Sequence, residues 1–227
     1  MATEILDRNN LPLDGFAGVK EHRLVMSPKV FKEVPPNESW KGIGGLVYLA
    51  DARFNANGET GMHSHREIDV ISIMLDGRLE HKGTLEDGQF LKLGSVQVQR
   101  AGCEGLKHNE INPDDTANRM LQLWVLPEKP DQDSGYKLYQ TKLGTVTQVY
   151  GGSKKQSETF DSKTIIEVAS LAEGQTYECD KEFMAYVAVG HGTANKVSVK
   201  EGDLIRGESL DFQVLEGAEL VIIYRNK

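Results

Sequence analysis

Residues 58–77 read GETGMHSHREIDVISIMLDG, and the interpretation of the chain starts from this stretch. His63 and His65 stand one residue apart in a chain that has only six histidines. After them, an apolar run ends at Asp76-Gly77, a residue pair typical of tight β-turns. The stretch therefore predicts a polar strand segment that carries the histidines, followed by an apolar strand and a turn.

The same pattern extends along most of the chain. Apolar residues recur with a period of two, and glycines interrupt them at intervals typical of β-hairpins. Further strand candidates are residues 44–54, 95–102 and 118–127, of which the last is apolar on both faces and is expected to be central. Since few segments show a helical period, the sequence predicts an all-β protein.

A segment rich in proline, glycine and charge, residues 127–144, separates two β-rich halves and is predicted to be a connector. Residues 171–192 weakly repeat the order of residues 56–77: a glycine turn, a polar strand start, an apolar strand and a closing glycine. A duplicated unit explains this repeat. We expect two β-barrel domains, 1–135 and 136–227.

Composition excludes several classes of function. With 227 residues, 39% of them hydrophobic, the chain can bury a sizeable core. Its formal net charge of −8 and the lack of a basic cluster indicate no direct binding of nucleic acid. No signal peptide and no apolar run long enough to cross a bilayer is evident, so we expect a cytoplasmic protein without membrane contact. Cys103 and Cys179 are expected to be free thiols.

The histidine pair suits a metal site. On a strand, residues i and i+2 point to one face, so His63 and His65 can present two imidazoles to one point. The alternative is a polar pair on a solvent-facing surface. His108 and Glu110 in KHNEI repeat the same spacing, and two strands can bring these ligands together. Three imidazoles and one carboxylate suit a first-row transition metal and leave positions open for water, dioxygen or a chelating substrate.

With these motifs the chain resembles a known family, the pirin-like bicupins, bacterial members of which include quercetin 2,3-dioxygenases. The resemblance rests on HSHREID at 63–69 for the family's H-P-H-x-x-x-E region, on HNE at 108–110 for its H-x-E, and on MLQLWVLPE at 120–128. It covers most of the chain but is more specific in the N-terminal half. It implies a bicupin, two tandem barrels of the double-stranded β-helix type.

The resemblance also implies a ligand set and a reaction. One metal, usually iron, is held by His63, His65, His108 and Glu110 in the first barrel, and none in the second, where residues 176–180 contain no histidine. Fe(II) is the first expectation, although the ligands also accommodate Mn, Ni, Cu or Zn. The expected reaction joins dioxygen to quercetin or a related phenolic substrate, with Glu110 acting as ligand and as general base.

Two other functions stay open from the sequence. The chain can be a non-catalytic, metal-binding regulatory module of the pirin type with a protein partner, or a degenerate bicupin that binds a small molecule without metal. The latter is kept open by residues 101–108, AGCEGLKH, which hold one residue more than the family's usual loop. We expect a monomer, because two barrels can satisfy each other's exposed edges.

Two more side chains near the motif receive predictions. Asp69 shares strand parity with His63 and His65 and is expected to orient an imidazole as a hydrogen-bond acceptor. His81 follows the apolar strand on a hairpin and is expected to be a surface residue rather than a ligand.

Overall fold

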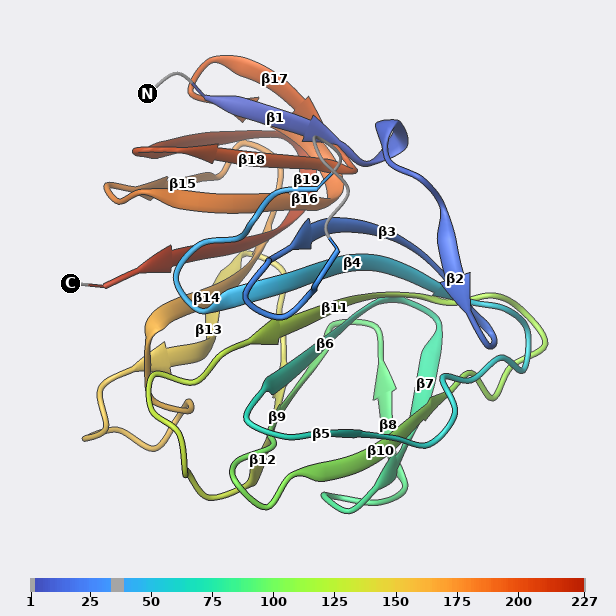
Figure 1. Cartoon of the computed structure of the whole chain (residues 1–227). Helices are drawn as coiled ribbons and strands as arrows, with labels where there is room; N and C mark the ends of the chain where they lie inside the picture. Colours follow the sequence, from blue (N-terminus) through green and yellow to red (C-terminus); the bar gives the residue numbers. More distant parts are fainter. Residues whose placement is uncertain (1–2, 34–38, 227) are drawn as a thin grey trace. The chain divides into compact units, whose positions relative to one another are not determined.

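The computed structural model describes residues 3–33 and 39–226, and Figure 1 shows that they form β-strands joined by turns. Among the described residues there is no α-helix, and the single helical element is the 3-10 turn η1 (Arg8–Asn10). The prediction of an all-β protein is therefore confirmed. No helix in the described part of the chain has the length and apolar character needed to cross a bilayer.

The chain divides into two compact units. The N-terminal unit comprises Leu11–Lys41 and Gly45–Gln140, and the C-terminal unit comprises Met1–Asn10, Gly42–Gly44 and Thr141–Lys227. The division into two β-barrel domains, 1–135 and 136–227, stays a prediction.

Two antiparallel sheets form the N-terminal unit. The larger has the order β12-β9-β6-β11-β4-β3-β2 and the smaller the order β5-β10-β7-β8. The strands of the larger sheet are β2 (Asp14–Phe16), β3 (Val19–Met26), β4 (Leu46–Phe54), β6 (Asp69–Asp76), β9 (Ser95–Arg100), β11 (Arg119–Val125) and β12 (Gly135–Gln140). Those of the smaller sheet are β5 (His63–His65), β7 (Arg78–Gly83), β8 (Gln89–Lys92) and β10 (Leu106–Ile111).

Apolar side chains from both sheets make one core. Phe54 and Met120 of the larger sheet and Leu79 and Leu91 of the smaller belong to the same buried cluster. β11 lies between β4 and β6, as its two apolar faces predicted. Gly77, in the predicted turn between β6 and β7, has φ +69°, and a Cβ there would meet the Asn118 Cβ at 2.8 Å. Local sequence and packing therefore agree at this turn.

The expected connector, residues 127–144, is only partly irregular. It contains β12, which pairs in register with β9 from Gly135–Arg100 to Gln140–Ser95. The neighbouring residues are rich in charge, proline and glycine, so the alternation of apolar residues typical of a strand is weak in this segment. Its backbone hydrogen bonds with β9 extend the larger sheet at one edge.

One antiparallel sheet forms the C-terminal unit, with the order β1-β18-β16-β19-β14-β13, while β15 pairs with β19 and β17 with β16. Its strands are β1 (Glu4–Asp7), β13 (Thr145–Gly152), β14 (Ser162–Leu171), β15 (Thr176–Cys179), β16 (Phe183–Ala194), β17 (Val197–Lys200), β18 (Asp203–Gly207) and β19 (Leu210–Arg225). The first strand of the chain thus pairs with β18, near the end of the sequence. Register shifts along β16 and β19 allow these long strands to bend around an apolar core.

Candidate metal centre

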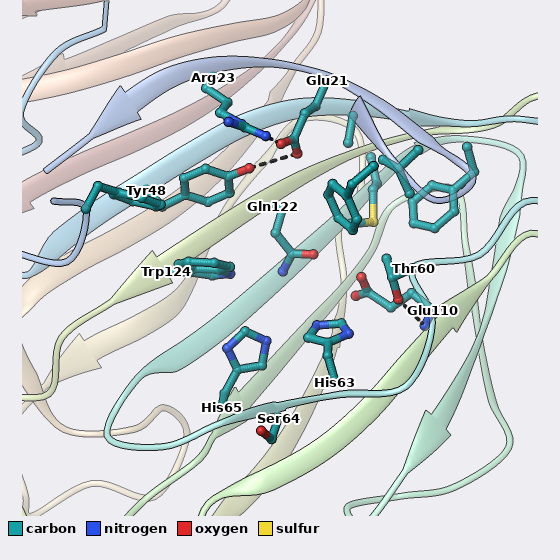
Figure 2. Close-up of a pocket in the computed structure, with 16 residues that line it drawn as sticks. Glu21, Arg23, Tyr48, Thr60, His63, Ser64, His65, Glu110, Gln122 and Trp124 are labelled. Atoms are coloured by element: carbon teal, nitrogen blue, oxygen red, sulfur yellow. Dashed lines mark hydrogen bonds and ion pairs between the residues drawn. The ribbon is translucent and has the colours of Figure 1, made fainter. Parts of the chain in front are cut away.

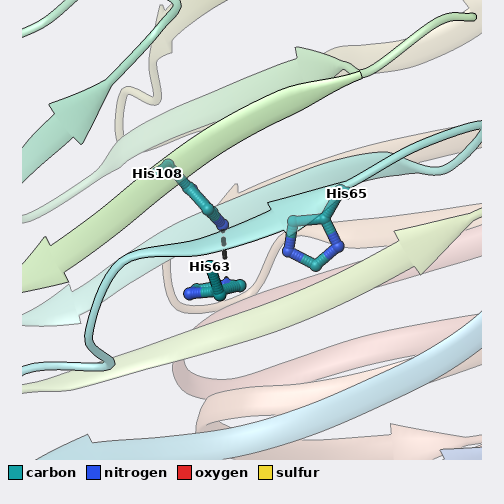
Figure 3. A group of neighbouring side chains, drawn as sticks. All are labelled: His63, His65 and His108. Carbon is teal, nitrogen blue, oxygen red and sulfur yellow. Dashed lines mark hydrogen bonds between the residues drawn. The ribbon is translucent and has the colours of Figure 1, made fainter. Parts of the chain in front are cut away.

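β5 and β10 bring three histidines together. The two strands pair antiparallel, with His63 opposite His108 and His65 opposite Leu106. The ring centroids lie 4.5 Å apart for His63 and His108, 4.9 Å for His63 and His65, and 5.1 Å for His65 and His108. One ring nitrogen from each lies within 4.8 Å of the others, and Figure 3 shows the three imidazoles gathered between the strands. These three residues are called the His triad below.

Hydrogen bonds hold two of the imidazoles. His63 Nδ1 lies 2.8 Å from the Gly61 carbonyl oxygen, so it must be the protonated nitrogen that donates. His63 Nε2 then carries a lone pair, and it lies 3.0 Å from His108 Nε2. The Gln99 amide contacts the far side of His108, with 3.1 Å between Gln99 Nε2 and His108 Nδ1. The donor set and its convergence suit a transition metal bound through Nε2 atoms.

Burial favours the neutral form of two of the three imidazoles, those of His65 and His108. Desolvation, and to a smaller extent the neighbouring His63, lowers the pKa of His65 to about 4. For His108, desolvation and then His63, His65 and His81 lower the pKa to about 2. Only a neutral imidazole can bind a metal, so metal binding requires no net release of protons from His65 and His108 near pH 7.

Glu110 lies beside the triad but outside the group of converging atoms. It is fully buried on β10, and Ser72 Oγ donates a hydrogen bond of 2.7 Å to its Oε1. Burial raises the pKa of Glu110 to about 7, against the smaller lowering by Ser72. Its role as the fourth ligand stays a prediction.

A cavity of about 590 Å³ opens in front of His63, His65 and Glu110 (Figure 2). Its walls are largely apolar and aromatic. Trp124 stacks on Phe31 with 5.9 Å between ring centroids, and its ring lies 4.6 Å from that of Tyr48 and 5.3 Å from that of His65. Volume and lining are typical of a small-molecule site.

The cavity also has a polar corner, on strands of the larger sheet. The hydroxyl of Tyr48 donates to Glu21 Oε2 at 2.8 Å, and Arg23 Nε donates to Glu21 Oε1 at 2.7 Å. Glu21 is buried, so these two bonds offset the loss of water around its carboxylate. Figure 2 shows Gln122 pointing into the space between this corner and the imidazoles of His63 and His65. No motif in the sequence indicated the corner, because its members come from separate strands.

The extra residue expected in the loop before His108 does not displace that histidine. Gly102 and Gly105 adopt φ +61° and +79°, and the Gly105 N–H donates to the Ala101 carbonyl at 3.1 Å. The turn absorbs residues 101–105, and β10 starts at Leu106 in register with β5. His108 therefore faces His63 as the motif predicts.

Two side chains differ from the predictions. His81 is fully buried rather than at the surface, with its ring centroid 5.6 Å from that of His108. The alternation from buried Leu79 through half-buried Glu80 could have revealed this inward position. The buried carboxylate of Asp69, expected to orient an imidazole, accepts a 3.0 Å hydrogen bond from Arg100 Nε. That ion pair balances the charge of Asp69 inside the unit.

Comparisons with known proteins identify relatives of both halves of the chain. The Pirin family model matches residues 44–125. A pirin-like protein of Caulobacter vibrioides is 25% identical over 202 residues, 83% of this chain and 85% of the relative. A quercetin 2,3-dioxygenase of Escherichia coli is 27% identical over 92 residues, 40% of this chain and 39% of the relative.

Solved structures match the fold over nearly the whole chain. Bacterial pirin YhhW from Escherichia coli, in complex with nickel(II), has a TM-score of 0.84, 16% identity and 98% coverage of both chains. A quercetin 2,3-dioxygenase from Acinetobacter baumannii has a TM-score of 0.70 and 15% identity, covering 98% of this chain and 85% of its own. The expected bicupin fold is thereby confirmed. Residues 44–125 therefore match the Pirin family model, and the whole chain has the fold of bacterial pirin.

Proposed function

We propose that this chain is a metal-dependent dioxygenase that cleaves quercetin or a related flavonol or phenolic chelator. The observation that carries this proposal is the His triad, two of whose imidazoles line a largely apolar cavity, with a buried carboxylate beside them. The names of the relatives support it, since one is called a quercetin 2,3-dioxygenase.

The residues proposed to hold the metal are His63, His65 and His108, with Glu110 as the fourth ligand. Fe(II) is our first choice, and Mn, Ni, Cu or Zn suit the same nitrogen-rich set; a structural relative was solved with nickel. A bound metal supplies a Lewis-acidic, redox-active centre where a phenolic oxygen and dioxygen can be held together.

The cavity walls orient the substrate. A flavonol is flat and aromatic, and the Phe31, Tyr48 and Trp124 rings offer stacking surfaces near His65. Glu21 and Arg23 can bind substrate hydroxyl groups at the opposite corner of the cavity. These contacts place one edge of the substrate towards the triad and keep water from the apolar walls.

Glu110 is our candidate for the proton acceptor. Its Oε1 is engaged by Ser72, so Oε2 is the atom proposed to take the proton from a substrate hydroxyl. A carboxylate at this position can accept that proton as a general base. Replacing Glu110 by Gln preserves the size of the side chain but removes its ability to accept this proton. We expect turnover to fall about 100-fold or more, with a smaller loss of metal.

The test follows oxygen uptake together with loss of flavonol absorbance for protein loaded with iron, manganese, nickel or copper. Turnover with at least one metal, absent from the His63→Ala variant, is the expected result. Bound metal without turnover favours the regulatory module and its protein partner. Failure to bind any metal favours the degenerate, metal-free bicupin.

A further inference from the structure

Two buried side chains behind the His triad have no part in the function proposed above. Gln99 on β9 and His81 on β7 are both fully buried. Gln99 hydrogen-bonds to His108, and its side chain also lies next to the His81 imidazole. One amide therefore lies between two imidazoles, only one of which belongs to the triad.

The hydrogen bonds define where the proton of His108 resides without a metal. Gln99 Nε2 is a donor only, so His108 Nδ1, 3.1 Å away, must accept. A neutral imidazole that accepts at Nδ1 carries its proton on Nε2. His108 Nε2–H then donates to His63 Nε2 at 3.0 Å, because His63 donates its own proton to Gly61. A proton thus occupies the nitrogen of His108 that the metal requires.

The same arrangement leaves two buried atoms unsatisfied. Among the described residues, neither Gln99 Oε1 nor His81 Nε2 has a hydrogen-bond partner. His81 Nδ1 lies 3.2 Å from the Glu86 carbonyl oxygen and must donate to it, so the Nε2 of neutral His81 is an acceptor. Both orphaned atoms are acceptors, and such buried groups are normally paired.

We propose that the Gln99 amide is a two-position hydrogen-bond switch that positions His108 for metal binding. After a half-turn of the amide, Oε1 accepts from His108 Nδ1–H and Nε2 donates to His81 Nε2. The Nε2 proton passes to water and Nδ1 takes up a proton from water, so the ring stays neutral with no net proton released and Nε2 is free for the metal. His81 favours this second position because its orphaned Nε2 then has a donor. The inference rests on the proposed metal site and adds Gln99 and His81 to it as positioning residues.

Gln97 provides a matched control for Gln99. It lies two residues earlier on β9, is fully buried, and accepts at Oε1 from the Tyr136 hydroxyl at 3.1 Å rather than touching the triad. We expect Gln99→Leu to weaken zinc binding about 10- to 100-fold, the usual effect of losing a partner of a metal-binding histidine. Gln97→Leu should leave the affinity unchanged. Competition with a chromogenic chelator measures both dissociation constants.

Nitrogen NMR of the histidine rings tests the switch itself. We expect His108 to carry its proton on Nε2 in the metal-free protein and on Nδ1 with zinc, while His63 keeps Nδ1–H in both. Gln99→Glu retains the side-chain length and can only accept when ionised, so it should hold His108 as Nδ1–H even without zinc. This variant also serves if Gln99→Leu does not fold.

The outcomes separate the two proposals. Equal zinc affinities of Gln99→Leu and Gln97→Leu, or His108 protonated at Nδ1 in the metal-free wild type, overturn the switch and leave the metal site standing. A wild-type chain that binds neither zinc, iron nor nickel contradicts the metal site, and the switch falls with it.

Discussion

The strand pair β5·β10 of the N-terminal unit and the pair β15·β19 of the C-terminal unit share a backbone pattern but differ in side chains. In the first, His63 lies opposite His108; in the second, Tyr177 lies opposite Phe212. Tyr177 and Phe212 belong to the apolar core of the C-terminal unit, and Phe212 is fully buried. The same antiparallel pairing thus carries imidazoles in one unit and core-packing side chains in the other.

The difference shows what a site requires beyond a strand pair. The imidazoles of His63 and His65 line an open cavity, whereas the Phe212 ring is packed in the apolar core of the C-terminal unit. Even the polar atom at this position is engaged, because the Tyr177 hydroxyl donates to Glu167 Oε2 at 2.6 Å. We therefore expect the metal only in the N-terminal unit.

The largest effect should follow from giving β10 the side chain of β19. His108→Phe removes a ligand nitrogen and fills its space, so metal affinity should fall by more than about 100-fold, beyond the loss caused by an outer partner. Elemental analysis of the purified variant measures this loss. His191→Phe, in the C-terminal unit and partly exposed, is the control and should retain the metal. A full equivalent of metal in His108→Phe would show that the triad is not the site.

For Phe212 we expect a substitution to reduce stability without reducing metal content. Phe212→Ala leaves a cavity in the apolar core and should lower the free energy of unfolding by about 3–5 kcal/mol. Denaturant titration checks the value. At temperatures where this variant is folded, its metal content should equal that of the wild type. A loss of metal with unchanged stability would mean that the two strand pairs do not have separate roles.

Lowering the pH should reduce the free energy of unfolding of the metal-free protein. Burial lowers the pKa of His108 from 6.5 to about 2. Below pH 6.5, His108 therefore becomes protonated in the unfolded chain but stays neutral in the native protein. The stabilising contribution is complete above pH 6.5 and is lost as the pH falls, by up to about 1.4 kcal/mol per pH unit. Denaturant titrations at pH 7, 6 and 5 should give a shallower dependence for His108→Phe than for the wild type. Identical slopes would exclude His108 as the source.

A smaller effect is expected at Tyr177. Tyr177→Phe removes the hydroxyl that donates to Glu167, while Tyr224 still donates to the same carboxylate at 3.0 Å. The loss should be about 1 kcal/mol in the free energy of unfolding, with no change in metal content. Tyr224→Phe offers a matched comparison, and a stability gain in either variant would contradict the hydrogen-bond interpretation.

The sequence predicted the parts of the structure that depend on local pattern. The i, i+2 spacing of His63 and His65 and the two apolar faces of β11 reflect strand geometry, and both predictions agree with the structure. β12 was missed because its pairing with β9 depends on backbone hydrogen bonds rather than on apolar side chains. The contact of Gln99 with His108 joins β9 to β10, so no spacing along the chain could reveal it. Long-range neighbours of the site could therefore not be predicted from the sequence. His81 is the exception, because its alternation with Leu79 along the strand indicates an inward position.

Anomalous diffraction from crystals of the zinc- or nickel-loaded chain would test most directly whether the N-terminal unit alone holds a metal. We predict one anomalous peak per chain, about 2.1 Å from the Nε2 atoms of His63, His65 and His108. A peak beside Tyr177 or elsewhere in the C-terminal unit, or no peak at the triad in metal-replete crystals, would contradict this assignment.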